Sequence, residues 1–223
     1  MTGAKQHSSL TLIILTAVCI GLPGTALARS ADSDIHTIST AFLLSDGSIK
    51  RRSGSGFVVG NRYYTALHNI EPASDVVKAT IELGGSVVEP SRIDVDHDLA
   101  MFELEGELCA RLCSSEDLRT PGFQPNMAIT WFRNVGDERT WKRAEITNVA
   151  YLAPVTTGGC GDQLVVEVNQ PFFPGSSGGP VFDLRSGAIV GLIQGSFESV
   201  DGDLTGFFKP IGCVEERLHG NPS

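Results

Sequence analysis

Basic residues are scarce in this sequence, which has 17 Lys and Arg against 26 Asp and Glu among 223 residues, a formal net charge of −9. That balance repels a phosphate backbone, and no polybasic stretch is present to hold the chain on an anionic membrane. Repeats, low-complexity tracts and long helical periodicity are also missing. These absences exclude nucleic-acid binding, coiled coil and extended disorder, and leave one or two ordinary globular domains.

The only long apolar run lies at the N-terminus, between Leu10 and Leu22, after the single positive charge of Lys5. It is shorter than the ~20 residues that cross a bilayer, and Pro23 and Gly24 follow it. Ala26-Leu27-Ala28 then has the small-x-small pattern of a signal-peptidase site. We therefore predict a signal peptide at residues 1–28, export to the periplasm or outside the cell, and no membrane-spanning segment in the mature chain.

Cysteine is also infrequent, and the predicted cleavage removes Cys19. The other four, in an oxidising compartment, allow three pairings. The short spacing of Cys109 and Cys113 favours a local disulfide and leaves Cys160 with Cys213. Free buried thiols are an alternative. A metal site is not expected, because no second close pair of Cys or His completes four ligands, and nothing in the sequence indicates a cofactor.

Short β-rich runs separated by Gly-rich turns fill the sequence from Thr37 onward, and the one helical candidate is a short segment near Val214–Leu218. This pattern predicts an all-β sandwich or barrel fold with a short C-terminal helix. The polar stretch Ser114–Gly122 is the most plausible seam between two units. We place the N-terminal unit at residues 29–118 and the C-terminal unit at residues 119–223.

Three short segments carry residues suited to acyl-transfer chemistry: Thr65–Asn69, Asp96–Ala100 and Pro174–Pro180. In the last, Ser177 lies between glycines that leave room for a substrate and let backbone N–H groups converge on an oxyanion. His68 is suited to accept the serine proton, and Asp98 to orient the imidazole. Taken singly, each has a structural reading: a turn serine, a hydrogen-bonded histidine, a strand-edge acid. The order His, Asp, Ser and the lack of long helices argue against an α/β-hydrolase elbow.

With these motifs, the chain resembles the trypsin-like (chymotrypsin-fold) serine proteases. The matching residues are Gly54-Ser55-Gly56-Phe57-Val58-Val59, Thr65 to His68, Asp98-Leu99-Ala100 and Gly175-x-Ser177-Gly178-Gly179-Pro180. The triad spacings of 30 and 79 residues and the segment Gly206 to Ile211 resemble the bacterial HtrA/Deg-type branch, without its PDZ domains.

This resemblance implies two six-stranded antiparallel β-barrels, with His68 and Asp98 in the first and Ser177 in the second. It also implies an oxyanion hole formed by the N–H groups of Gly175 and Ser177, and protein or peptide substrates.

The resemblance further implies a substrate pocket beside the serine, lined by Pro171, Ile193, Gln194 and Gly195. No acidic residue occupies the position of Pro171, which disfavours cleavage after Lys or Arg. Ile193, where glutamate-specific relatives have histidine, disfavours cleavage after Glu. A small or apolar side chain is therefore expected at the cleavage site.

Two residues depart from the family pattern: Leu67 stands where alanine is usual, and Asn69 where cysteine or an aliphatic residue is usual. These two departures favour an alternative, in which the chain is a catalytically impaired protease fold that binds peptides or a partner protein.

The motifs taken together predict a secreted or periplasmic serine endopeptidase that uses His68, Asp98 and Ser177 through an acyl-enzyme. A third reading, an esterase or acyltransferase on the same scaffold, predicts turnover of small esters but not of peptides.

Overall fold

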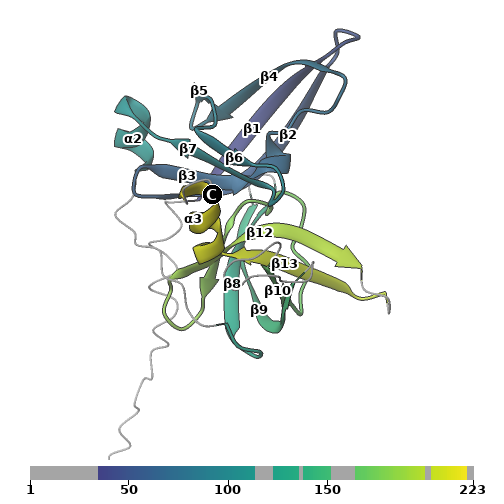
Figure 1. Ribbon diagram of the computed structural model, residues 1–223, viewed down its shortest axis with the longest axis vertical. Coiled ribbons are helices and arrows are strands. Elements are labelled where there is room, and N and C mark those ends of the chain that lie inside the picture. Colours follow the sequence, from purple (N-terminus) through teal and green to yellow (C-terminus); the bar gives the residue numbers. More distant parts are fainter. Residues whose placement is uncertain (1–34, 114–122, 136–137, 152–163, 199–201, 220–223) are drawn as a thin grey trace, which may run out of the picture.

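The computed structural model describes residues 35–113, 123–135, 138–151, 164–198 and 202–219. Two β units are stacked along the long axis of the molecule, and the short helix α3 lies where they meet (Figure 1). The predicted signal peptide, the boundary at residues 118/119 and Cys160 lie outside the described residues, and these parts of the predictions remain predictions. No helix in the described part of the chain is long and apolar enough to cross a membrane.

The N-terminal unit is one antiparallel sheet of seven strands, in the order β5-β4-β1-β2-β3-β7-β6. Its strands are β1 Ile35–Leu44, β2 Ile49–Val59, β3 Arg62–Ala66, β4 Val76–Leu83, β5 Ser86–Val88, β6 Arg92–Asp94 and β7 Leu99–Glu103. Strand β1 buries Ile35, Ile38 and Phe42. Gly60, with φ +59°, makes the tight turn from β2 to β3.

This sheet is open, so the prediction of a closed six-stranded barrel is wrong for the N-terminal unit. The two edge strands, β5 and β6, follow each other along the chain and are separated only by Glu89, Pro90 and Ser91. Each edge strand has three residues, and Pro90 has no N–H to contribute to a ladder. An apolar cavity of about 350 Å³ lies between β4 and β6; among the residues lining it are Leu67, Ala79, Ile81, Pro90, Ile93 and Val95.

The C-terminal unit is a closed antiparallel barrel of six strands, as predicted, in the order β10-β13-β12-β11-β8-β9. Its strands are β8 Ala128–Val135, β9 Glu138–Tyr151, β10 Leu164–Val168, β11 Pro180–Asp183, β12 Ile189–Glu198 and β13 Leu204–Pro210. Its core contains Trp131, Phe172, Val181, Ile193 and Phe208. The ring of Phe172 meets Trp131 edge-on, with 4.9 Å between ring centroids.

Three short helical segments complete the described fold: η2 Leu67–Asn69, α2 Gly106–Leu112 and α3 Ile211–His219. The predicted C-terminal helix is thus confirmed, with wider bounds than the sequence indicated. Cys109 and Cys113 form the predicted local disulfide at the end of α2. Cys213 in α3 is also disulfide-bonded.

The two units share a buried cluster that joins them. The sheet contributes Phe57, Tyr64, Ala66, Leu99 and Met101, the barrel Phe182, Ile189 and Leu192, and α3 Ile211, Val214 and Leu218. Full burial of a side chain such as Phe or Leu stabilises a fold by roughly 1.5–3 kcal/mol. The shared cluster therefore fixes the sheet and the barrel relative to each other.

Candidate active site

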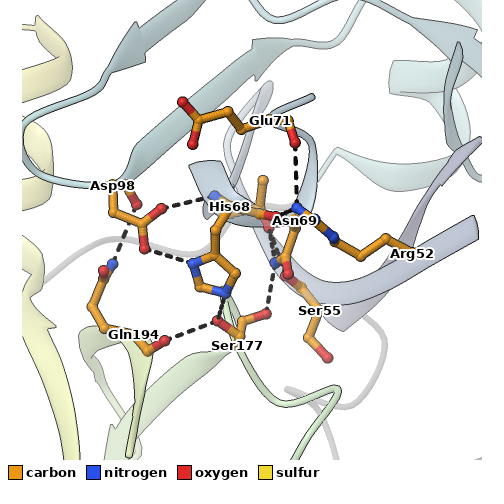
Figure 2. A network of polar contacts seen from close by, with 9 residues as sticks. Arg52, Ser55, His68, Asn69, Glu71, Asp98, Ser177 and Gln194 are labelled. Atoms are coloured by element: carbon orange, nitrogen blue, oxygen red, sulfur yellow. Dashed lines mark hydrogen bonds and ion pairs between the residues drawn. The ribbon is translucent and has the colours of Figure 1, made fainter. Parts of the chain in front are cut away.

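The three residues predicted as a triad meet where the sheet faces the barrel. His68 lies in η2 directly after β3, Asp98 immediately precedes β7, and Ser177 lies in the turn that leads into β11. Strand β3 pairs with β7, with Ala66 opposite Leu99, so this pairing brings the ends that carry His68 and Asp98 together. Figure 2 shows the three side chains in one hydrogen-bonded series.

Asp98 holds His68 at two points. Its Oδ2 lies 2.6 Å from the imidazole Nδ1, and its Oδ1 accepts the backbone N–H of His68 at 2.7 Å. A carboxylate only accepts hydrogen bonds, so Nδ1 carries a proton, and in the neutral imidazole Nε2 then presents a lone pair on the opposite side of the ring. Asp98 has φ +56°, in the left-handed region that Asp tolerates better than most residues, and its carbonyl accepts the N–H of Leu67 at 3.1 Å.

Ser177 faces that lone pair. Its Oγ lies 2.6 Å from His68 Nε2 and 3.0 Å from the carbonyl oxygen of Gln194. The hydroxyl therefore has a base within hydrogen-bond reach before any substrate binds, which is the geometric requirement for general-base activation. The His68 side chain is 43% exposed, which leaves the group open to an incoming molecule.

Several backbone groups of the loop around Ser177 form hydrogen bonds within the loop or to the barrel. Phe173 to Ser176 form a turn closed by the Ser176 N–H and the Phe173 carbonyl at 3.0 Å, with Pro174 and Gly175 (φ +88°) in the middle, the residue pattern of a type II turn. The N–H of Gly178 donates to Ile193, and that of Gly179 donates to Ser176.

Two N–H groups of this loop, those of Gly175 and Ser177, make no hydrogen bond to any residue that the structure describes. They are the pair expected from the sequence to hold an oxyanion. Free N–H donors beside a nucleophile are suited to stabilise negative charge that develops on a carbonyl oxygen.

Strand β2 holds this loop from the sheet side. The Ser55 N–H donates to the Ser177 carbonyl at 3.0 Å, and the Ser55 hydroxyl donates to the Gly175 carbonyl at 2.5 Å. Gly178, with φ +82°, approaches so closely that a Cβ there would overlap the carbonyl oxygen of Ser55 and the hydroxyl of Thr65. The only sequence signal for this docking was the run Gly54-Ser55-Gly56, which sequence reasoning used as a family match but gave no role.

Arg52, also on β2, supports the His68 segment. Its guanidinium donates to the carbonyl oxygen of His68 and, at 3.3 Å, to that of Glu71 (Figure 2). The same group lies 5.3 Å from the centroid of the Phe42 ring, a cation–π distance. Sequence reasoning missed this residue, because an Arg on a β-hairpin is usually a solvated charge.

The two departures from the family pattern are both buried. Leu67 is 4% exposed and packs in the sheet's own core with Ile70 and Phe102. Asn69 is 3% exposed, and its Nδ2 donates to the Ser177 carbonyl at 2.9 Å and to Thr65 Oγ1 at 3.0 Å. His68 keeps both of its 2.6 Å partners with these neighbours in place.

The four residues predicted to line a substrate pocket have different surroundings. Ile193 is fully buried in the barrel core, and the Gln194 amide turns back toward Asp98, with its Nε2 3.4 Å from the Asp98 carbonyl. Pro171 and Gly195 are partly buried, at the two segments that flank Ser177. The side chains of Ile193 and Gln194 therefore do not line the same side of a pocket beside Ser177. The substrate pocket remains a prediction.

A group of charges lies behind Asp98. His97 Nδ1 is 2.9 Å from both carboxylate oxygens of Asp94, which fixes the turn that precedes Asp98. Burial lowers the pKa of Lys209 on β13, and the negative charges of Asp94 and Asp98 partly oppose this shift. Within the described ranges, no three His, Cys, Asp or Glu side chains are grouped so as to hold a metal ion.

The family model of the trypsin-like peptidase domain matches residues 54–192, more than half of the chain. No curated protein sequence matches the chain.

Several solved structures share the fold. The active form of the Rv3671c protease from M. tuberculosis is 18% identical, with 100% of this chain and 96% of that chain covered and a TM-score of 0.63. The HtrA-type protease AlgWS227A with a decapeptide is 16% identical, with 89% of this chain and 68% of that chain covered and a TM-score of 0.65. Deg5 is 20% identical, covering 85% and 88%, with a TM-score of 0.63.

Proposed function

Because this chain belongs to the trypsin-like peptidase family, we propose that it is a serine endopeptidase in which Ser177 is the nucleophile. His68 acts as the general base and acid, and Asp98 orients His68. The observation that carries the proposal is the unbroken series from Asp98 through His68 to Ser177, with both side-chain separations at 2.6 Å. An acid that orients a base, which in turn contacts a nucleophile, is the arrangement that serine proteases use for acyl transfer.

In the first half of the proposed reaction, Ser177 Oγ attacks the scissile carbonyl carbon while His68 Nε2 takes the hydroxyl proton. The negative charge that forms on the carbonyl oxygen is held by the N–H groups of Gly175 and Ser177. When the carbon–nitrogen bond breaks, His68 returns its proton to the leaving amine. The acyl group stays on Ser177 as an ester.

In the second half, a water molecule attacks the ester carbonyl, and His68 Nε2 takes a proton from that water. The second tetrahedral intermediate collapses, the bond to Ser177 Oγ breaks, and His68 gives the proton back to Oγ. Asp98 keeps its negative charge throughout and stabilises the imidazolium that forms in each half.

The test is hydrolysis of a peptide library and of a denatured protein by the full chain and by Ser177→Ala, His68→Ala and Asp98→Asn. Each substitution is expected to lower kcat by about 10⁴-fold while substrate binding persists. Ser186→Ala, a substitution in an exposed turn, is the matched control and is expected to keep wild-type turnover. Peptide cleavage that survives Ser177→Ala contradicts the proposal. Peptide binding without cleavage in wild type favours the binding-module alternative.

We also propose that the protein acts in the periplasm or outside the cell on protein or peptide substrates. The leader pattern at residues 1–28 supports export, and the Cys109–Cys113 disulfide is typical of an oxidising compartment. N-terminal sequencing of the protein from fractionated cells is expected to give a chain that starts at Arg29. A chain that keeps residues 1–28 and remains in the cytoplasm contradicts this part of the proposal.

A further inference from the structure

A buried amide lies next to the proposed nucleophile and has no part in the reaction described above. Asn69 follows His68 directly, and only 3% of it is exposed. Its Nδ2 donates one hydrogen bond across to the barrel, to the Ser177 carbonyl at 2.9 Å, and a second to Thr65 Oγ1 at 3.0 Å. One residue of η2 thus holds both the preceding strand β3 and the loop that carries Ser177.

The orientation of this amide follows from its partners. A backbone carbonyl oxygen only accepts hydrogen bonds, so the group facing Ser177 must be the amide nitrogen. Thr65 gives its hydroxyl proton to the Ser55 carbonyl at 2.8 Å, and its oxygen is therefore available to accept from Asn69. Turning the amide over would set its oxygen against both acceptors.

Ser55 completes the arrangement. Its N–H donates to the same Ser177 carbonyl that Asn69 holds, and its hydroxyl donates to the Gly175 carbonyl. We call these two residues the Ser55–Asn69 clamp (Figure 2). The clamp fastens the carbonyls of Gly175 and Ser177, the same two residues whose N–H groups have no partner among the residues that the structure describes.

We propose that Asn69 is a positioning residue that keeps the N–H of Ser177 directed at the oxyanion, and this rests on the function proposed above. The peptide unit is planar, so fixing a carbonyl also fixes the N–H of the next residue. The clamp fixes the peptide after Gly175 and the peptide after Ser177. The peptide between Ser176 and Ser177, which carries the Ser177 N–H, is held at its own carbonyl by the Gly179 N–H at 2.9 Å, and the clamp holds the peptides on either side of it.

Gly54 on β2 is matched to Asn69. A Cβ at position 54 would overlap the Cγ, Oδ1 and Nδ2 atoms of the Asn69 side chain. Gly54 does not have a positive φ, so its backbone conformation does not require glycine. A side chain at position 54 would instead occupy the space that the Asn69 amide fills. A substitution at Gly54 is therefore a second way to displace the amide, with Asn69 left unchanged.

The first experiment measures kcat and KM of Asn69→Leu, which keeps the approximate shape and removes the donor. Since one hydrogen bond of ordinary net strength corresponds to roughly a tenfold change in rate, we expect kcat to fall about tenfold with KM nearly unchanged. Gly54→Ala is expected to lower kcat similarly. It is expected to have no further effect when combined with Asn69→Ala, because the amide it displaces is then gone.

The second experiment separates positioning from a change in charge near His68. In Asn69→Asp, burial raises the pKa of the introduced carboxyl, and its protonated form again donates to the Ser177 carbonyl. The ratio of its kcat to that of wild type is therefore expected to rise as the pH falls. A purely electrostatic effect has the opposite sign, because a carboxylate beside an imidazole favours its protonated form, which cannot act as a base, and this lowers the ratio at low pH. Asn61→Asp, at an exposed turn, is the charge-matched control and is expected to keep the wild-type profile.

A third measurement does not depend on activity. In a Ser177→Ala background, Asn69→Leu is expected to increase amide hydrogen exchange in residues 175–179 about tenfold. Wild-type kcat in Asn69→Leu, or a ratio that falls with decreasing pH, overturns the inference. If wild type neither cleaves peptides nor reacts at Ser177, the proposed function fails, and the exchange measurement then decides alone. Faster exchange supports the clamp, and unchanged exchange overturns it.

Discussion

Gly178, the residue after the proposed nucleophile, offers a demanding test of how the loop docks on the sheet. It has φ +82°, and a Cβ there would lie 2.7 Å from the Ala66 nitrogen, with the Ser55 carbonyl oxygen and the Thr65 hydroxyl closer still. Ordinary contact begins at 3.4 Å. In Gly178→Ala the loop must therefore retreat by at least about 0.7 Å. Because a misplacement of about 1 Å costs roughly 100-fold in rate, we expect kcat/KM to fall by about 100-fold.

The backbone conformation adds a cost of its own, about 1–2 kcal/mol for an L-residue in the left-handed region. Gly47→Ala separates the two effects, because Gly47 has φ +83° and nothing within 4 Å of a Cβ. Both variants are expected to lose similar stability to strain, measured by thermal unfolding, but only Gly178→Ala loses activity in an assay with a cleaved peptide. Activity of Gly178→Ala within threefold of Gly47→Ala refutes the docking argument.

Three further predictions concern the surroundings of the site. Arg52→Met keeps the apolar stem but loses the bond to the His68 carbonyl, and initial rates on a peptide substrate are expected to fall roughly fivefold. Burial lowers the pKa of His219 below its ordinary 6.5, so the unfolded chain binds more protons and stability falls as the pH drops through 6.5. Thermal unfolding between pH 7.5 and 5 should show a larger decline for wild type than for His219→Gln, and equal declines contradict the assignment. Gly191→Ala overlaps the Phe208 ring in the barrel core and is expected to cost about 1–3 kcal/mol of unfolding free energy in denaturant melts; an unchanged midpoint contradicts this.

The meeting of His68, Asp98 and Ser177 could be predicted from the sequence, because each lies in a short segment at the start or end of a β-rich run. Residue type and order were enough to propose roles for them. The hydrogen bonds at 2.6 Å could not be predicted in this way, since they depend on the register of β3 against β7 and on the cluster that joins the sheet to the barrel.

The open N-terminal sheet could not be predicted from strand patterns alone. The β-rich runs of this unit fit a closed barrel as well as an open sheet. Closure depends on whether β5 and β6 pair across the short segment that holds Pro90, and this is a matter of three-dimensional spacing. Helix α2 was missed for a different reason: its seven residues are too few to show a helical period, and Glu105 provides no side-chain cap.

Asn69 shows most clearly what sequence reasoning lacks. In the sequence it is only a departure from a family pattern, and it was taken as a reason for impaired activity. Its partner, the Ser177 carbonyl, is 108 residues away in the chain. Every residue has a backbone carbonyl, so the residue type at position 177 does not indicate which groups donate hydrogen bonds to that carbonyl.

The claim that Ser177 is a nucleophile activated by His68 is tested most directly by reaction of the full chain with a fluorophosphonate, followed by peptide mass mapping. The account predicts a single phosphonyl adduct on Ser177 that forms at neutral pH and is lost in His68→Ala. No adduct between pH 6 and 9, or an adduct on Ser177 that forms equally fast without His68, contradicts it.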